Sequence, residues 1–361
     1  MLKKTSERNL KMLKHEWVYR YLCEEIIRIL DRSGKGLPTE EDLCRTCHVS
    51  RQTLRKAISR LKSENVITSR QGSGMFLTGI YPGRINQIVL IVQDPEAYMT
   101  PVLISKISGY FAARHFHVSV IATGGSRNTE GQILQKLMDS PPRGMFIQCI
   151  SGAVPTPYQQ FFLDLEHAGT RIVFLGERYP NVSSGIIASS DDMQGSFEMT
   201  EHLISLGHRR IGCLFNSDSL SGHEKYLGFA QAMLSHGLML HDEQVCWISE
   251  REIQILRSDR SRTLLQRILQ EYPPEITALL CQNDELAFHV VRSIREPGSV
   301  LSPGICVTGF DNSYLLETGT VSFLTMETDS PEEFACSLMY QALLGSRPDT
   351  GKMRWKLIGA G

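Results

Sequence analysis

The chain has 361 residues, of which 42% are hydrophobic and 21% are charged, as is usual for a folded globular protein. This length exceeds one typical hydrophobic core, so we expect at least two domains. The net charge is −1, but residues 1–80 hold 16 lysines and arginines against 9 acids and the remainder holds 22 against 30, which indicates that the N-terminal part binds a polyanion.

The N-terminus is polar, and no apolar segment follows it, so we expect no secretion signal and a cytoplasmic protein. The longest apolar runs, such as 88–92, have the length of a strand and exclude a membrane-spanning helix. The nine cysteines lack the spacing of a small disulfide-linked scaffold, which favours reduced thiols.

Two helices are expected in the first fifty residues. The first covers 16–30, because its apolar side chains form one helical stripe: Val18, Leu22, Ile26 and Ile29. The glycines at 34 and 36 end it. The second begins after Thr39, whose hydroxyl can cap it, and the acids that follow suit the positive end of the helix dipole.

A third helix is expected from Ser50, which caps it, to Asn65. One side of this helix is apolar, and the other carries polar side chains near the N-terminus: Arg51, Gln52 and Arg55. Two β-prone runs, 66–69 and 75–77, flank the glycine-rich stretch 70–74 and predict a hairpin. Three helices and a hairpin form a winged helix-turn-helix.

Segments 37–40, 49–57 and 70–77 resemble the DNA-binding domain of the GntR family in both order and spacing. The resemblance implies that the third helix enters the major groove and that the hairpin meets the DNA backbone or the minor groove. It implies these DNA-binding residues: Thr39, Ser50, Arg51, Gln52, Thr53, Arg55, Arg70, Gln71, Gly72 and Gly74.

The chemistry of these side chains agrees with that role. Arginine pairs with guanine and glutamine with adenine, while Thr53 and the helix N-terminus suit phosphate. One position departs from the family. Glu41 stands where the family usually has a basic residue that contacts DNA, which puts that contact in question.

The second helix also contains a haem-attachment pattern, formed by Cys44, Cys47 and His48. It lies where haem would disrupt the helix-turn-helix packing. We therefore expect thiols there, and we predict no cofactor and no metal.

A short junction rich in proline and glycine at 79–84 predicts a linker between a DNA-binding domain, 1–78, and a larger domain, 85–361. In the larger domain, strand-like and helix-like segments alternate, which is typical of parallel sheets in an α/β fold with two lobes. The expected strands are 85–92, 118–122, 145–150, 171–175, 210–215, 245–248, 276–281, 305–310 and 321–326. Expected helices include 192–206, 222–236 and 284–295.

Residues 85–345 resemble the effector-binding domain of the LacI/GalR family, which has the two-lobed fold of periplasmic sugar-binding proteins. The resemblance rests on four segments: 200–211, 226–229, 281–287 and 307–312. Together with the GntR-type domain, the layout is similar to that of arabinose-responsive repressors.

The second resemblance implies a ligand site made by Asp191, Lys225, Asn283 and Asp284. A sugar site also needs an aromatic side chain over the apolar ring face, and Tyr98, just after the first strand of the larger domain, is the candidate. The two carboxylates would accept ligand hydroxyls, although each can instead cap the helix that it begins. Lys225 replaces the family's arginine and offers a point charge in place of a planar fork. Tyr98 fits either an aromatic cover for a sugar ring or packing at the lobe surface.

We find no serine elbow, P-loop, zinc-protease motif or dinucleotide-binding turn, and we predict no enzyme. The sequence predicts a homodimeric transcription regulator, a repressor by resemblance, that binds a double-stranded DNA operator and a small sugar-like effector and binds no membrane. Two alternatives stay open. They are a sugar-binding receptor of the transport type and an enzyme whose N-terminal domain docks a protein.

Overall fold

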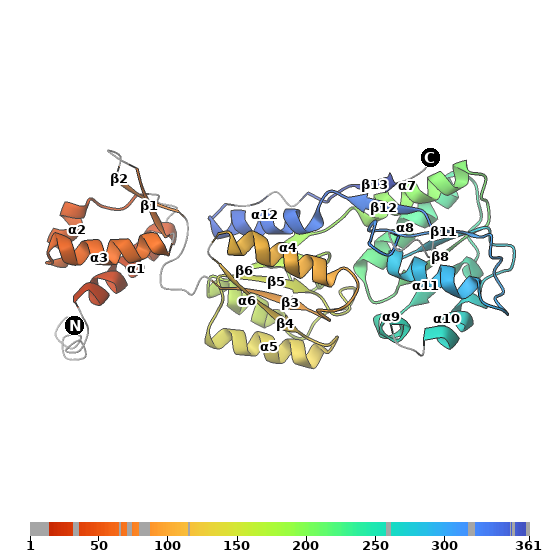
Figure 1. Ribbon diagram of the computed structural model, residues 1–361, viewed down its shortest axis with the longest axis horizontal. Coiled ribbons are helices and arrows are strands. Elements are labelled where there is room, and N and C mark those ends of the chain that lie inside the picture. Colours follow the sequence, from red (N-terminus) through yellow and green to blue (C-terminus); the bar gives the residue numbers. More distant parts are fainter. Residues whose placement is uncertain are drawn as a thin grey trace.

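The computed structural model describes residues 14–31, 36–64, 66–70, 74–78, 87–114, 116–257, 261–316, 322–346, 348 and 351–358. They form an N-terminal winged module and two α/β lobes (Figure 1). The predicted fold class is confirmed. The predicted linker, 79–84, lies outside the described residues, so the domain boundaries stay predictions.

The winged module has three helices and a hairpin: α1 (Lys14–Asp31), α2 (Glu40–Cys47), α3 (Arg51–Ser63), β1 (Ile67–Arg70) and β2 (Gly74–Leu77). One apolar core joins these elements, with Leu22, Leu54 and Leu61 at most 1% exposed. Tyr19 on α1 donates a hydrogen bond of 2.6 Å to Glu64, just beyond α3, and so ties the first helix to the third.

Lobe 1 holds a parallel sheet in the order β4-β3-β5-β6-β7. The strands are β3 (Gln87–Val92), β4 (His117–Ala122), β5 (Gly144–Gln148), β6 (Arg171–Leu175) and β7 (Ile186–Ala188), and the helices are α4 (Thr100–Ala112), α5 (Arg127–Asp139), α6 (Gln159–His167) and α12 (Pro331–Leu343). Leu90 packs with α4 and α12, whereas Val89 and Ile91 pack with α5 and α6. Helices thus cover both faces (Figure 1), which is why β3 is apolar from Ile88 to Val92.

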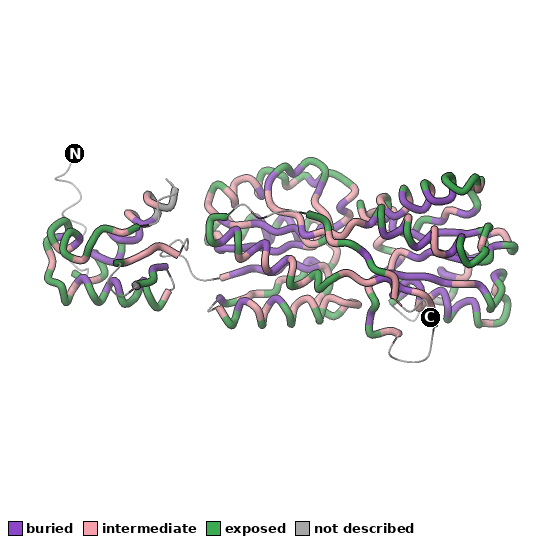
Figure 2. Tube along the Cα trace, turned by 90° about the horizontal axis from the view of Figure 1, so that it is seen from above, coloured by how far each residue is buried: buried purple, intermediate pink, exposed green. Residues whose placement is uncertain are grey.

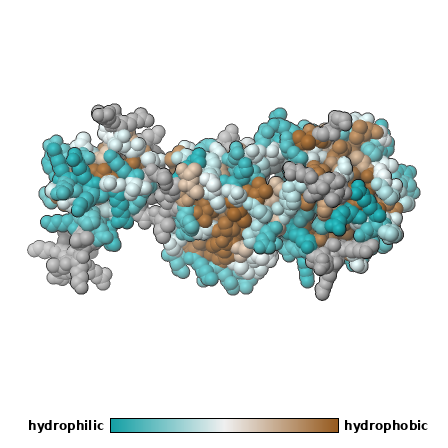
Figure 3. Space-filling view, viewed as in Figure 1, coloured by the Kyte–Doolittle hydropathy of each residue, from teal (hydrophilic) through white to brown (hydrophobic). Residues whose placement is uncertain are grey.

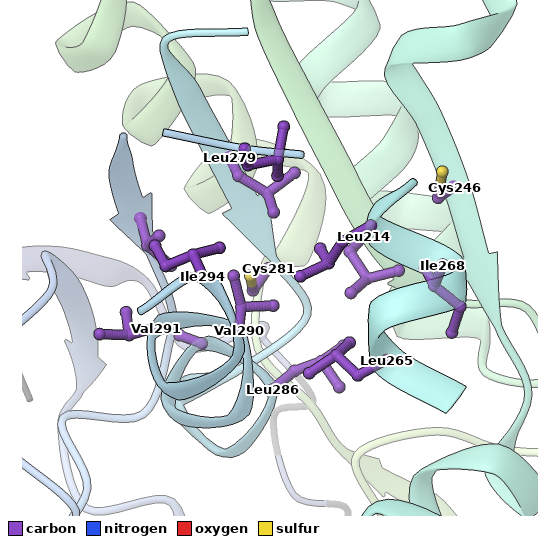
Figure 4. Packing of buried hydrophobic residues seen from close by; sticks show 14 of the residues in the cluster. Leu214, Cys246, Leu265, Ile268, Leu279, Cys281, Leu286, Val290, Val291 and Ile294 are labelled. Atoms are coloured by element: carbon purple, nitrogen blue, oxygen red, sulfur yellow. The ribbon is translucent and has the colours of Figure 1, made fainter. Parts of the chain in front are cut away.

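Lobe 2 holds a parallel sheet in the order β11-β10-β8-β9. Its strands are β8 (Ile211–Asn216), β9 (Val245–Ile248), β10 (Ala278–Cys281) and β11 (Cys306–Thr308), and its helices are α7 (Asp192–Ser205), α8 (Leu220–Ser235), α9 (Glu250–Leu256), α10 (Ser261–Leu269) and α11 (Asp284–Ile294), with a 3-10 turn η1 (Asp242–Gln244). Figure 4 shows Leu214 and Leu279 packed with Leu265, Leu286 and other buried side chains of α10 and α11. The opposite face packs against α7 and α8.

The chain passes between the lobes three times, after β7, after β12 (Thr325–Thr328) and after α12. The last passage brings β13 (Trp355–Ile358) back to lobe 2, where it pairs antiparallel with β12. Met353 lies beside the first passage and exchanges backbone hydrogen bonds of 2.7 Å and 3.0 Å with Asp191 and Ser189. Figure 2 shows purple, buried segments running through the middle of each lobe, so each has a core of its own.

The expected strands 171–175 and 245–248 agree with β6 and β9, and most others agree within two or three residues. The strand expected at 305–310 is shorter, because β11 ends at Thr308 and leaves Phe310 in a loop. We predicted neither β7 nor β13, whose pairing partners lie elsewhere in the chain. Among the described residues, no helix has a segment that is long and apolar enough to span a membrane.

Candidate functional site

The N-terminus of α3 carries the first candidate site. Ser50 accepts the backbone N–H of Thr53 at 3.2 Å and caps the helix. Leu54 and Leu61 point into the core, so the opposite, exposed side of the helix holds the predicted DNA-binding side chains Arg51, Gln52 and Arg55. The structure therefore brings these three residues together on the solvent-facing side of α3, whose other side packs into the core.

The start of α2 lies beside this surface. Thr39 caps α2 by accepting the N–H of Asp42 at 3.2 Å. Arg55 donates to the carboxylate of Glu40 at 3.2 Å, so this arginine already has an acidic partner on α2. Glu41, the departure from the family pattern, is exposed and forms a 3.4 Å ion pair with Arg45.

The hairpin supplies the rest of the predicted DNA-binding surface. Arg70 ends β1 and pairs with Gly74, which begins β2 with φ +96°, a backbone conformation that favours glycine. Gln71 and Gly72 lie outside the described residues. The cysteines of the haem-like pattern lie at the end of α2, where Cys47 is buried in the core and Cys44 packs against it.

The second candidate site lies where the two lobes meet. Ligands of open parallel sheets bind at the carboxyl ends of strands, and here the loops after these ends touch one another. The N–H of Ala153, after β5, donates to the carbonyl of Asp218, after β8, at 3.0 Å. Tyr98, after β3, donates to Asp311, after β11, at 3.0 Å. We call this region the inter-lobe cleft.

Lys225 of α8 forms a buried ion pair in the cleft wall. Its Nζ lies 2.8 Å from Oδ1 of Asp192 and 3.0 Å from the hydroxyl of Ser221. The Lys225 and Asp192 side chains are 4% and 10% exposed. The ammonium also faces the rings of Phe310 and Trp355, at 4.6 Å and 5.3 Å from their centroids.

A glycine sets this geometry. At Gly228, one helical turn beyond Lys225, a Cβ would collide with the backbone carbonyl of Met193. Glycine lets α8 approach α7 closely enough for Lys225 to reach Asp192. The indole N–H of Trp355 donates to the same Asp192 oxygen at 3.0 Å, so β13 completes the arrangement.

Asp284, at the start of α11, is fully buried, and both of its oxygens accept hydrogen bonds within the protein. The Thr325 hydroxyl donates to Oδ1 at 2.6 Å and the Ser313 N–H donates to Oδ2 at 2.8 Å. Burial raises the pKa of Asp284 to about 7. Asn283 caps α11 through a 3.1 Å bond from the N–H of Leu286.

Asp284 thus fixes the loop that presents Asp311, a carboxylate that we did not predict from sequence. Burial raises the pKa of Asp311 to about 6, and the charge of Lys225 opposes this increase. The backbone of Asp311 has φ 103°, unusual for a residue other than glycine, and such strain often marks a functional site.

Asp191 takes a different place from its neighbour. It caps α7 through a 3.3 Å bond from the N–H of Gln194, whereas Asp192 turns toward Lys225. The structure therefore brings Lys225, Tyr98 and Asp284 to the cleft together with three residues that sequence reasoning missed: Asp192, Asp311 and Trp355. Asp311 directly follows the Gly-Phe pair of the segment 307–312, and that proximity is the signal by which it could have been found.

A cavity of about 320 Å³ opens beside Tyr98. Asp94 lines it on the lobe 1 side, and Arg257, Glu285 and His289 line it on the lobe 2 side. Burial lowers the pKa of His289, which favours the neutral form of its ring. Among the described residues, no group of three histidine, cysteine or acidic side chains is placed to hold a metal ion.

Both the N-terminal module and the larger domain match known protein families. Residues 14–77 match the family described as bacterial regulatory proteins, gntR family, and residues 200–345 match the periplasmic binding protein-like domain. The chain therefore combines a GntR-type helix-turn-helix domain with a periplasmic-binding-protein-like domain. This combination defines the class of protein, a DNA-binding transcription regulator with a periplasmic-binding-protein-like domain.

Two curated relatives are similar over most of their length. The arabinose metabolism transcriptional repressor of Geobacillus stearothermophilus is 29% identical over 297 residues, which cover 81% of this chain and 80% of the relative. The repressor of the same name from Halalkalibacterium halodurans is 25% identical over 321 residues, which cover 87% and 84%.

Solved structures share the fold. A complex of the transcriptional regulator CelR with cellobiose has a TM-score of 0.62 at 19% identity and covers 86% of this chain and 90% of that one. A LacI transcriptional regulator from Alkaliphilus metalliredigens, complexed with D-xylulofuranose, has a TM-score of 0.60 at 18% identity and covers 76% and 97%.

Proposed function

We propose that this protein is a cytoplasmic repressor whose affinity for operator DNA is controlled by a sugar-like ligand bound in the inter-lobe cleft. One observation carries the proposal: the chain joins an exposed Arg51, Gln52 and Arg55 surface on a GntR-type helix to a two-lobed domain in which Lys225 and several carboxylates lie near the junction of the lobes. The names of the two curated relatives described above specify arabinose metabolism and repression, which supports both the DNA-binding and the sugar-binding part of the proposal.

In the proposed complex with DNA, α3 enters the major groove and the residues predicted from sequence make the contacts. Arg51, Gln52 and Arg55 reach base edges, while Thr39, Ser50 and Thr53 contact phosphates near the two helix N-termini. The hairpin residues Arg70, Gln71, Gly72 and Gly74 contact the backbone or the minor groove. Glu41 gives no phosphate contact in this arrangement, because its charge repels the DNA.

In the proposed ligand complex, a polyhydroxylated ring lies between the lobes. Carboxylates accept hydrogen bonds from its hydroxyl groups, Lys225 donates a hydrogen bond to a ring or hydroxyl oxygen, and Tyr98 covers one apolar face of the ring. Asp191, Asn283 and Asp284 belong to the proposed site, although each also has a partner within the protein. The protein acts by binding, without catalysis, as the names of its relatives as regulators suggest.

We further propose a two-fold homodimer that presents two winged modules to a pseudo-palindromic operator. The edge strand β4 of lobe 1 supports this proposal, because Val120 on β4 and Val102 on the neighbouring α4 are both more than a third exposed. Figure 3 shows hydrophobic surface gathered on this side of lobe 1. Ligand binding changes DNA affinity only if the ligand binds one arrangement of the lobes more tightly than the other.

The test is DNA binding as a function of salt and ligand. DNA selected from a random library by the full chain is titrated at several salt concentrations, and the affinity is expected to fall steeply as phosphate contacts release counterions. Arg51→Ala is expected to weaken binding by about 10–100-fold, the value of one bidentate base contact. The control Arg210→Ala, on the surface of lobe 2, is expected to leave the DNA affinity unchanged.

The same complex is then titrated with pentoses and hexoses. Release of the DNA by one of them is the expected result. DNA binding that no salt concentration weakens, or selected sequences that Arg51→Ala binds as tightly as the parent chain does, would contradict the proposed DNA-binding surface.

A further inference from the structure

The cationic groups around the inter-lobe cleft already have protein acceptors. Lys225 is neutralised by Asp192 at 2.8 Å. Arg257, in the wall of the cavity beside Tyr98, forms two parallel bonds of 2.6 Å and 2.7 Å with Glu285. The bidentate Arg257 pair satisfies both charge and geometry. An anionic ligand must therefore displace a carboxylate before it can pair with the charge of either cation.

The helix N-terminus that opens onto the cleft is also occupied. Helix α8 has no cap from its own Ser219. Instead, Glu177 of lobe 1 accepts the Ser219 hydroxyl at 2.9 Å and the Leu220 N–H at 2.6 Å with one carboxylate oxygen. Its other oxygen accepts the N–H of Gly152 at 3.1 Å. A protein carboxylate thus fills the position where a phosphate or sugar acid would otherwise bind.

Arg178, next to Glu177, makes hydrogen bonds within lobe 1. Its guanidinium donates to the carbonyls of Ser184 and Gly185, both at 3.3 Å, within lobe 1. Arg127, at the start of α5, likewise donates to the carbonyl of Pro155 at 3.3 Å. These arginines brace loops of lobe 1, and their hydrogen bonds are made with backbone carbonyls.

Carboxylates are more numerous than cations around the cleft. Asp311 accepts a hydrogen bond from Tyr98. The pKa of Asp284 is governed mainly by its burial and by Ser313, Thr325 and Asp311, and none of these residues is a cation. Further acids border the same region: Asp94 and Glu96 in the cavity wall, and Glu250, which accepts from Asn216. Acidic groups thus outnumber the cations in this region, which disfavours anions and favours ligand groups that donate hydrogen bonds.

We propose that the cleft selects an uncharged, hydroxyl-rich sugar and excludes the phosphate esters and carboxylic acids of the same sugars. The inference rests on the proposed function and narrows it, because phosphorylated and oxidised sugars are otherwise equal candidates. The hydroxyl groups of an uncharged sugar donate hydrogen bonds to Asp311 and the neighbouring carboxylates. An anion must either displace Asp192 from Lys225 or Glu177 from α8, which leaves a buried carboxylate without a partner.

The first experiment compares matched sugars on the full chain by calorimetry. The pairs are arabinose with arabinose 5-phosphate, ribose with ribose 5-phosphate, and glucose and galactose with their 6-phosphates and uronic acids. At least one uncharged sugar is expected to bind, with its phosphate or acid at least about 30-fold weaker. An anionic member that binds as tightly as its uncharged parent overturns the proposal.

The second experiment needs no knowledge of the effector. Inorganic phosphate is followed by ³¹P line width in the parent chain, in Lys225→Met and in Asp192→Asn. The parent and Lys225→Met are expected to give the same line width, because Asp192 already neutralises the charge of Lys225. Asp192→Asn removes the competing charge and is expected to produce phosphate binding at least about 10-fold tighter.

Broadening that is present in the parent and lost in Lys225→Met overturns the inference directly, and so does an Asp192→Asn variant that is folded by circular dichroism yet gains no phosphate binding. Because Asp192→Asn is nearly isosteric, it keeps an oxygen for Trp355 and Lys225. If no sugar binds while phosphate behaves as expected, the sugar assignment fails and the exclusion of anions stands.

Discussion

The ammonium of Lys225 lies 2.8 Å from the carboxylate of Asp192, and both side chains are buried between α7 and α8. The pair is completed by the indole of Trp355, which comes from the last strand of the chain. Lys225 thereby takes the place that the LacI/GalR resemblance gives to an arginine, with one ionic partner on the neighbouring helix.

Removing the lysine should destabilise the domain strongly. Lys225→Met leaves Asp192 buried without its cation, and we expect a loss of about 3–5 kcal/mol in the free energy of unfolding, measured by urea denaturation. The double variant with Asp192→Asn should recover part of this loss. Lys356→Met breaks the exposed pair with Asp329 and should cost less than about 1 kcal/mol. Equal losses at the two lysines would contradict the role of burial.

Two serine caps allow a matched test of the DNA-binding helix. Ser50 and Ser126 each accept the N–H of a threonine three residues on, at 3.2 Å. Each alanine substitution should cost about 1 kcal/mol in the domain that carries it. Only Ser50→Ala should also weaken DNA binding, because Ser50 starts the helix that carries Arg51. A DNA-binding defect in Ser126→Ala would point to an indirect effect.

Glu41 offers a test by gain of function. Glu41→Arg restores the basic residue usual in the family at an exposed position on α2. We expect tighter DNA binding and one additional phosphate contact, which steepens the slope of log affinity against log salt by about 0.9. Glu275→Arg makes the same charge change on the surface of lobe 2 and should leave the slope unaltered.

The contact of Glu177 with α8 should hold the lobes together. The Glu177 carboxylate accepts hydrogen bonds from three donors at the start of α8 and from the N–H of Gly152. Glu177→Gln removes its charge and should destabilise the contact between the two lobes by about 1–3 kcal/mol. The radius of gyration from small-angle scattering should increase. Glu166→Gln is the control, because Glu166 accepts the N–H of Gly185 within lobe 1 alone. An increase in both variants would show general loosening.

The stability of the protein should fall as pH rises toward neutrality. Burial raises the pKa of Glu130 to about 7, so the folded state binds a proton that the unfolded state releases near pH 4. The stability from this group is complete below the unfolded pKa and is lost as pH rises through the folded pKa. Asp284 acts in the same direction.

Thermal denaturation between pH 5 and pH 8 measures this effect. Glu130→Gln keeps an acceptor for the 2.7 Å bond from Tyr179 and should flatten the dependence of Tm on pH. The control Glu198→Gln, on the exposed side of α7, should leave the dependence of Tm on pH unchanged. An unchanged slope in Glu130→Gln would show that another group carries the titration.

Local patterns predicted most of the secondary structure. The stripe from Val18 to Ile29 predicted α1, and the serine at position 50 predicted the start of α3, because helix periodicity and capping depend on nearby residues. Apolar runs such as 171–175 predicted strands that are buried on both faces. The two resemblances then supplied the order of the domains and drew attention to Lys225 and Asp284.

The sequence by itself therefore determined the winged module, the parallel sheets and the polar surface of α3. Only the tertiary structure decided which carboxylate meets Lys225. Asp191 and Asp192 are adjacent in the chain, but the close approach of α8 at Gly228 fixes the rotation of α7 and turns Asp192 inward.

The same holds for contacts between distant segments. Trp355 reaches Asp192 across 163 positions, and Glu177 of one lobe caps a helix of the other. No local periodicity encodes such pairs, because they depend on how the chain crosses three times between two separately packed cores.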